Sequence, residues 1–307
     1  MSGKGMCDSL PSGERQQRES LRLSRRQCLA GMAGLTATAM ATPLRAQTPE
    51  ALSFGLTPVF LTSNLALLER LQTYLEEMTD RPVRLVTRRT YQEITSLVVS
   101  GQVDAAWICG YPYVQYRDSL SLMAVPVWRG RPLYQSYLIA DANRSGDDWR
   151  VIEGDIHAFS DPDSNSGYLV TAALLAEEGK IPDGFFRNSF YTYGHRNVVR
   201  AVASGLAQSG SVDGYVWEVM KEMEPELTGR TRILHASDWL GFPPIACARE
   251  SAGARKTQLL QNALLGMEDS SSGRSVLEML RLDGFTSARD GLFDSIARKV
   301  ELVRRTA

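Results

Sequence analysis

The stretch that decides the fold is Ser160-Asp161-Pro162-Asp163-Ser164-Asn165-Ser166-Gly167-Tyr168-Leu169. It follows a short apolar run at 155–159 and precedes a helix-like run at 169–176. The pattern predicts a strand, a hydroxyl-rich turn and a helix start, with Ser164 or Ser166 as the cap. The free N–H groups of a first helical turn favour an anion. On these residues alone, an ordinary capped turn and an anion-binding helix start both remain open.

The first 46 residues are predicted to be an export signal rather than part of the fold. Arg25-Arg26 stands directly before a mildly apolar run at 28–40, and Ala46 supplies a small residue before a cleavage point. This arrangement is typical of a twin-arginine signal peptide, cleaved near Ala46, and it predicts a periplasmic location. The apolar run is short and weakly hydrophobic for a membrane span. An uncleaved N-terminal anchor is the alternative.

Composition and net charge indicate a soluble protein and argue against a nucleic-acid-binding one. The chain has 307 residues, of which 43% are hydrophobic and 22% charged, as in a soluble protein with a substantial core. The net charge is −1, and the predicted signal removes more basic than acidic residues. A net negative chain argues against nucleic-acid binding.

Two cysteines, Cys109 and Cys247, follow the predicted signal. They could form a disulfide in an oxidising compartment or remain two separate thiols. Their spacing does not indicate a structural metal site.

Strands alternate with helices along the first part of the remaining chain. Strands are expected at 51–56, 83–86 and 105–109, and helices at 64–78 and 91–100. Such alternation predicts an α/β fold with a mostly parallel sheet. Ligands of these sheets bind beyond the carboxyl ends of the strands. Thr57, Cys109 and Tyr111 fall at such ends.

A second α/β unit begins near Arg150, after a polar segment at 141–148 that contains Gly146. Its expected elements are strands at 155–159, 189–193 and 212–217, and helices at 167–178 and 197–206. Returning strands are expected at 233–236 and 245–248, and the C-terminal stretch is expected to form helices at 256–267 and 274–282. We therefore expect two lobes with a cleft between them. Lobe 1 would comprise 47–140 plus 245–307, and lobe 2 would comprise 141–244. The two crossings would lie near 139–149 and 238–248.

Several segments together resemble a known family. They are Gly110-Tyr111-Pro112-Tyr113, the tyrosine-rich run at 134–137, the serine stretch at 160–169 and Gly194-His195. Over about residues 50–290 the chain resembles the phosphate/phosphite/phosphonate-binding proteins of ABC transporters. The resemblance implies a two-lobed periplasmic-binding-protein fold with two hinge crossings. It also implies a monomer without a cofactor that delivers a small oxyanion to an ABC permease.

The resemblance also implies which residues contact the ligand, and these are Ser164, Asn165, Ser166, His195, Tyr111 and Tyr134. The serine stretch would supply helix-start donors, and the two tyrosines would form the wall of the pocket. His195 could donate from either ring nitrogen, and its protonation would strengthen anion binding. Asp213 is expected to end a loop and cap the strand rather than to bind, because its charge would repel an anion.

Cys109 is a departure from many members of that family. A thiol is a poor partner for a phosphate-like oxyanion but a good ligand for arsenic(III). In this respect the chain resembles the arsenite-sensing periplasmic proteins, a branch in which a cysteine of this loop takes part in ligand binding. The partner would then be a membrane sensor kinase, and Cys109 would coordinate the arsenic. Cys247 is expected in the core.

An enzyme is the remaining class. Ser166 and His195 could be paired as a secreted serine hydrolase. However, the chain lacks a nucleophile-elbow motif and a phosphate-cradling loop. We therefore predict a binding protein and no catalysis.

Overall fold

The computed structural model describes residues 50–58 and 65–307. The predicted signal at 1–46 lies outside the described residues. All described elements belong to a compact unit of residues 48–307. In the part of the chain that is described, none of the helices is both long and apolar enough to cross a membrane.

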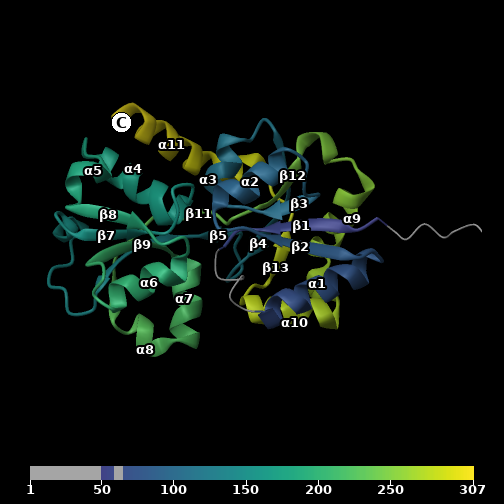
Figure 1. Ribbon diagram of the computed structural model, residues 1–307, viewed down its shortest axis with the longest axis horizontal. Coiled ribbons are helices and arrows are strands. Elements are labelled where there is room, and N and C mark those ends of the chain that lie inside the picture. Colours follow the sequence, from purple (N-terminus) through teal and green to yellow (C-terminus); the bar gives the residue numbers. More distant parts are fainter. Residues whose placement is uncertain (1–49, 59–64) are drawn as a thin grey trace, which may run out of the picture. The chain divides into compact units, whose positions relative to one another are not determined.

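The first sheet has six strands in the order β13-β4-β12-β3-β1-β2 (Figure 1). β2 and β3 run parallel to β1, whereas β12 is antiparallel to β3 and β4. The sheet is therefore mixed, and the expectation of a mostly parallel sheet holds only for one half of it. Its strands are β1 (Leu52–Leu56), β2 (Val83–Thr87), β3 (Ala105–Trp107), β4 (Leu120–Val127), β12 (Ile245–Ala248) and β13 (Gly284–Thr286).

Helices of this lobe form where apolar residues recur at helical spacing. In α1 the buried apolar residues are Leu67, Leu71, Tyr74 and Leu75, which lie along one face. α2 begins with a capping box in which Thr90 and Glu93 bond to each other's backbone N–H groups. The helices of this lobe are α1 (Leu65–Thr79), α2 (Tyr91–Val99), α3 (Gly110–Gln115), α9 (Arg255–Leu265) and α10 (Ser271–Leu280).

The second sheet has five strands in the order β10-β6-β9-β7-β8. β7 is parallel to β8 and β9, whereas β6 is antiparallel to β9 and β10. Its strands are β6 (Ser136–Asp141), β7 (Ile156–Phe159), β8 (Asn188–Tyr191), β9 (Ser209–Asp213) and β10 (Thr231–Ala236). Its helices are α4 (Val170–Ala176), α5 (Pro182–Phe185), α6 (His195–Ala203), α7 (Gly214–Met223) and α8 (Pro225–Thr228).

The first crossing differs from the expected one at 139–149. β6 pairs with β9 of the second sheet, with Ser136 opposite Asp213. The chain therefore leaves the first sheet after Val127 and reaches the second at Ser136. The polar segment at 141–148 looked like a linker, but Arg144 forms an ion pair with Asp155 beside the second sheet. It is a surface loop of that lobe.

A short ribbon joins the two sheets. β5 (Leu133–Tyr134) and β11 (Leu240–Gly241) pair in antiparallel fashion and run between the sheets (Figure 1). They belong to the outgoing and the returning chain, respectively. The return thus falls within the expected range of 238–248, and β12 begins at Ile245.

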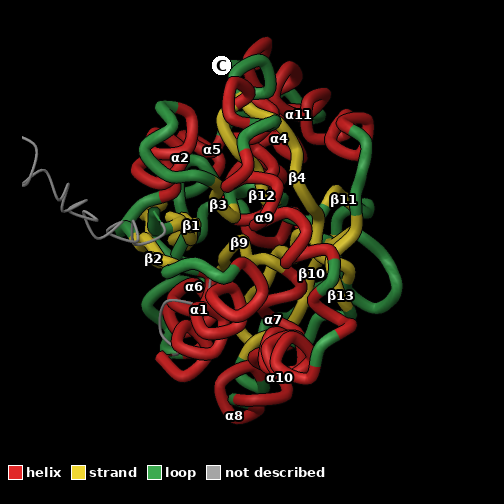
Figure 2. Tube along the Cα trace, turned by 90° about the vertical axis from the view of Figure 1, so that its right-hand side faces the viewer, coloured by secondary structure: helices red, strands yellow, loops and turns green. Residues whose placement is uncertain are grey.

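Two further elements differ from the sequence expectation. Residues 214–217 begin α7 instead of continuing a strand, because the Asp213 side chain accepts the Val216 N–H and caps the helix. The last helix, α11 (Asp294–Thr306), was not predicted. It contacts α3 of the first lobe and α4 of the second, and Figures 1 and 2 both draw it beside α4.

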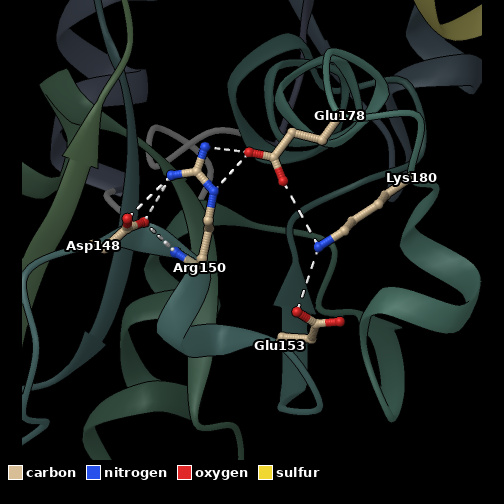
Figure 3. Close-up of polar contacts among 5 residues, drawn as sticks. All are labelled: Asp148, Arg150, Glu153, Glu178 and Lys180. Carbon is tan, nitrogen blue, oxygen red and sulfur yellow. Dashed lines mark hydrogen bonds and ion pairs between the residues drawn. The ribbon is translucent and has the colours of Figure 1, made fainter.

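A network of charged side chains lies on the surface of the second lobe (Figure 3). Arg150 pairs with Asp148 and Glu178, and Lys180 pairs with Glu178 and Glu153. The Arg150 guanidinium also lies over the Trp149 ring, 4.7 Å from its centroid. Exposed pairs of this kind contribute little individually and are screened by salt.

We expect Arg150→Gln to lower the melting temperature slightly in low salt, and the difference from wild type to shrink in high salt. The reason is that Arg150 joins two carboxylates, Asp148 and Glu178, on the exposed surface. Thermal unfolding at two salt concentrations measures this. Arg305→Gln, which removes one exposed pair with Glu301, is the control and should have a smaller effect. A salt-independent loss would contradict the electrostatic explanation.

Candidate ligand-binding site

The serine stretch forms a capped helix start, as its sequence predicts. Ser164 is the N-cap, and its hydroxyl accepts the Gly167 N–H at 3.0 Å. The first turn is wide, because Leu169 N–H bonds to Ser164 O and Val170 N–H to Asn165 O, five residues back. Such π-helical turns are rare and are frequent at functional sites.

Gly167 is required by close packing of this turn. A Cβ at Gly167 would lie 1.8 Å from Ser160 Oγ and 2.9 Å from Ser164 Oγ. Both serine hydroxyls therefore occupy the space that a side chain would need. The glycine allows the strand end and the helix start to fold back on each other.

The beginning of β6 holds the serine stretch in place. The Ser136 hydroxyl donates to Ser166 O at 2.7 Å, and Ser136 N–H donates to Ser237 Oγ at 2.9 Å. Ser237 N–H in turn donates to Ser136 O. The two segments next to the crossings are thus bonded to each other and to the helix start.

Three of the predicted site residues meet across the two lobes. Cys109, the N-cap of α3, accepts the Asn165 N–H on its sulfur at 3.1 Å. The Asn165 side-chain amide donates to the Tyr134 hydroxyl at 2.8 Å. All three side chains are buried. Cys109 therefore faces the serine stretch, and burial raises the pKa of its thiol to about 12.

The cysteine alternatives can be compared with the structure directly. Cys109 and Cys247 are both buried and free. Cys247 lies on β12 within the core of the first lobe. Two separate thiols are present, and there is no disulfide between them in the described chain.

His195 is held in one tautomer by its neighbours. The Asp213 N–H donates to Nδ1 of His195 at 3.1 Å, so Nδ1 carries no proton. In the neutral ring Nε2 then carries the proton and donates to the Tyr91 oxygen, 3.2 Å away. The Tyr91 hydroxyl hydrogen is consequently left to donate to another acceptor.

This geometry corrects the expected role of His195. Protonation was expected to strengthen anion binding, but a proton on Nδ1 would face the Asp213 N–H. Burial lowers the pKa of His195 to about 3. The imidazole is therefore neutral near pH 7, and it offers Tyr91 a hydrogen bond rather than a positive charge.

Asp213 caps a helix, α7, rather than the strand that was expected, and it also lies beside the serine stretch. Its carboxylate accepts the Val216 N–H at 3.2 Å, and the Ser166 hydroxyl lies next to it. Burial raises the pKa of Asp213 to about 7, against the lowering effect of the Val216 N–H bond and of the nearby Ser166 hydroxyl. The group is therefore partly protonated near neutral pH and can donate as well as accept.

Several polar atoms of the site are buried without a partner. Within residues 50–58 and 65–307, hydrogen-bond partners are missing for Ser160 Oγ, Asn165 Oδ1 and Ser166 Oγ. A buried polar group without a partner costs about 1–3 kcal/mol. Such a cluster is explained if a ligand supplies the missing bonds.

The site residues share a chemical character. They offer hydroxyls, an amide, a thiol, a neutral imidazole and a carboxyl, and none of those gathered here is arginine or lysine. The exposed pair Arg88-Arg89 keeps to the surface of the first lobe. The arrangement suits a small ligand that both accepts and donates hydrogen bonds.

Two predicted residues are placed less centrally. The Thr57 hydroxyl donates to Trp107 O at 3.2 Å, so its hydrogen is used to join β1 and β3. Tyr111 is half-buried, and burial raises its pKa, with Asp163 and Arg304 nearby. Contact of Thr57 and Tyr111 with a ligand remains a prediction.

Sequence reasoning missed Tyr91 and Ser136 and gave Asp213 no binding role. Tyr91 could have been found, because it follows the carboxyl end of β2 as Cys109 follows that of β3. Ser136 had no such signal, because its strand was assigned to the other sheet.

Comparison with known proteins identifies the family of this chain. Residues 54–293 match the model of a family described as the periplasmic substrate-binding protein of ABC phosphonate transporters. A phosphate-import protein, PhnD, of Mycolicibacterium smegmatis is 26% identical over 234 residues, which are 70% of this chain and 73% of that protein.

Solved structures share the fold. A binding-protein component of an ABC phosphonate transporter from Pseudomonas aeruginosa has a TM-score of 0.76 at 20% identity, over 83% of this chain and 87% of that one. PhnD1 from Prochlorococcus marinus, in complex with methylphosphonate, has a TM-score of 0.73 at 17% identity, over 83% and 99%. The two-lobed fold that the sequence predicts is confirmed by these neighbours. With the family match over residues 54–293, it follows that the chain belongs to the periplasmic substrate-binding proteins of ABC phosphonate transporters.

Proposed function

We propose that this protein binds a small phosphorus oxyanion that keeps at least one proton, such as phosphate, phosphite or methylphosphonate. It would do so in the periplasm, after removal of residues 1–46, and deliver the ligand to an ABC permease. The observation that carries the proposal is the set of buried, unpartnered atoms Asn165 Oδ1 and Ser166 Oγ. They belong to the same cluster as the Tyr91 hydroxyl, whose hydrogen is available.

The charge of the site favours a partly protonated ligand. Asn165 Oδ1 can only accept a hydrogen bond, and Asp213 accepts one when ionised. A fully ionised oxyanion would have no hydrogen for these acceptors and would be repelled by Asp213. A ligand with an O–H group donates to Asn165 Oδ1, and with its other oxygens it accepts from Tyr91, Ser166 and the protonated form of Asp213.

Closure of two lobes would bury the ligand. We place the hinge in the segments 128–135 and 237–244, where β5 and β11 pair between the sheets. Lobe 1 then corresponds to the first sheet and lobe 2 to the second, with Ser136–Asp141 in lobe 2. Hinge closure of this kind presents a new surface to a partner.

The site is better suited to binding than to catalysis. A serine hydrolase needs a histidine nitrogen free to take the serine proton. Both ring nitrogens of His195 are engaged, one by Asp213 N–H and one by Tyr91. Its pKa of about 3 also makes it a poor base for Ser166.

Arsenite is a second candidate ligand, favoured by the position of the Cys109 sulfur beside Asn165 N–H. Arsenous acid is neutral and carries three O–H groups, which suit a site without a cation. The Cys109 thiol would form an S–As bond, with its proton and one arsenic hydroxyl leaving as water. The protein would then report to a membrane sensor kinase instead of a permease.

Calorimetry with phosphate, phosphite, methylphosphonate and arsenite distinguishes the two candidates. We expect heat of binding from at least one phosphorus oxyanion, and Cys109→Ser should change that affinity by less than about tenfold, since a thiol is a weak hydrogen-bonding group. Cys247→Ser, in the core of lobe 1, is the matched control. If none of the phosphorus ligands gives heat of binding, and arsenite gives heat that Cys109→Ser abolishes, arsenite replaces the phosphorus oxyanion as the proposed ligand.

Binding of the phosphorus oxyanion should weaken as the pH rises through about 7, the raised pKa of Asp213. Above that pH the ionised carboxylate repels the anion, at most by about tenfold per pH unit for one proton. Asp213→Asn imitates the protonated form and should flatten this part of the profile, leaving the titration of the ligand itself. Asp147→Asn, on the surface, is the control. Identical profiles for wild type and Asp213→Asn would contradict the role of Asp213.

The same raised pKa has a consequence for stability. Asp213 holds a proton in the folded protein between pH 3.8, the ordinary pKa of an aspartate, and about pH 7, its raised pKa. Its contribution to the free energy of unfolding is therefore complete below 3.8 and is lost as the pH rises through about 7. Asp213→Asn should remove this loss in denaturant titrations without ligand.

Tyr91→Phe should weaken ligand binding by about tenfold to a hundredfold, the loss expected for one hydrogen bond to a charged acceptor. The ring stays in place, because Tyr91 is fully buried against its neighbours. Calorimetry measures the affinity, and Tyr116→Phe, at an exposed tyrosine, is the control. Unchanged affinity in Tyr91→Phe would mean that its hydroxyl hydrogen does not reach the ligand.

A further inference from the structure

Tyr91 is bonded to the second lobe at both of its ends. Its backbone N–H donates to Asp161 Oδ2 at 3.3 Å, and its hydroxyl meets His195 Nε2 at 3.2 Å. Tyr91 begins α2 of the first lobe, whereas Asp161 and His195 belong to the second. Of these two bonds, the one to Asp161 involves no group that we assign to the ligand.

Asp161 is built to accept this bond. The residue is only 1% exposed, although it lies in the turn that follows β7. Its other oxygen, Oδ1, accepts the Asp163 N–H at 2.8 Å, which fixes the direction of the carboxylate. One oxygen is thus used within lobe 2, and the other reaches lobe 1.

The partner of Asp161 is a group that α2 cannot satisfy by itself. The first N–H groups of a helix have no carbonyl partner within it, and they carry the positive end of the helix dipole. Thr90 Oγ1 accepts the N–H of Glu93, and Glu93 accepts that of Thr90. The N–H of Tyr91 is satisfied from the other lobe, by a carboxylate suited to a helix N-terminus.

We infer that Asp161 is a positioning residue that holds the two lobes closed by capping α2 across the cleft. It acts through Tyr91 and does not touch the ligand. When the lobes separate, Tyr91 N–H and Asp161 Oδ2 both return to water, so the bond favours the closed state. The inference rests on the proposed function only in that closure is taken to trap a ligand.

A second bond between the lobes reports closure independently. Asn165 N–H donates to Cys109 Sγ of lobe 1, whereas Asp213 N–H donates to His195 within lobe 2. Exchange of the Asn165 amide hydrogen should therefore follow opening of the cleft. Exchange of the Asp213 amide hydrogen should follow only disruption of lobe 2.

The test is residue-resolved amide hydrogen exchange on the ligand-free full chain. In Asp161→Ala we expect the Tyr91 and Asn165 amides to exchange about tenfold faster or more, as for loss of a charge-assisted hydrogen bond, with Asp213 unchanged. Asp163→Ala, which removes the neighbouring carboxylate, should leave all three rates unchanged. Faster exchange at Asp213 as well, or at Tyr91 alone, would overturn the inference in favour of a local structural role.

A second pair of variants leaves the Asp161 turn intact. Tyr91→Ala and Tyr91→Pro both remove the phenol, but only proline removes the N–H. Proline is tolerated at the first helical position, and Thr90 before it already has the extended backbone that proline requires. Asn165 should exchange faster in Tyr91→Pro than in Tyr91→Ala, and the difference should vanish when Asp161→Ala is added. Equal rates in Tyr91→Pro and Tyr91→Ala would overturn the inference. Because no ligand is present, failure of the proposed function would leave these rates unaffected.

Discussion

The hydrogen bond from Asp213 N–H to Nδ1 of His195 is the constraint on which the rest of the site depends. A backbone N–H can only donate, so it places the imidazole proton on Nε2 and directs it at Tyr91. The Tyr91 hydroxyl must then turn its own hydrogen elsewhere. The Asp213 N–H of lobe 2 thereby leaves the Tyr91 hydroxyl of lobe 1 free to donate its hydrogen to a ligand.

The strand register of the second sheet sets where that amide lies. Ser136 stands opposite Asp213 in the pairing of β6 with β9, and the Ser136 hydroxyl holds Ser166 O. A shift of one residue would turn the side chains of β6 to the opposite face of the sheet. The distance between Asp213 and the serine stretch therefore depends on a pairing between strands far apart in the sequence.

This dependence explains which features could be predicted from the sequence. The turn at 160–169 could, because its cap, its glycine and its helix are neighbours in the chain. The limits of β12, at 245–248, also followed from a local apolar run. The lobe assignment of Ser136–Asp141 could not, because an apolar strand pairs equally well with either sheet until its partner is known. Residues 214–217 were read as strand from their apolar character, whereas the cap on Asp213 made them helical.

The site residues also divide into those that local motifs predict and those that depend on distant parts of the chain. Ser164, Asn165, Ser166, Cys109, Tyr134 and His195 were named from motifs that are local in the chain, and the structure gathers them. Asp213 was given no binding role because a carboxylate repels an anion. That argument assumed an ionised group, and burial beside Ser166 changes the assumption by raising its pKa to about 7.

The sulfur of Cys109 accepts a hydrogen bond from the Asn165 N–H, a donor that a ligand oxygen would be expected to use. Asn165 N–H is a first-turn donor, and it points at Sγ instead of at an empty position. Sulfur is a weak acceptor, so an oxyanion that took over this N–H would gain more than the thiol loses. An arsenic ligand would instead bind the sulfur and leave the amide where it is. A phosphorus oxyanion would therefore replace the contact between Asn165 N–H and Cys109 Sγ, whereas an arsenic ligand would bind its sulfur. The buried thiol is protonated at neutral pH, and a neutral thiol repels neither ligand.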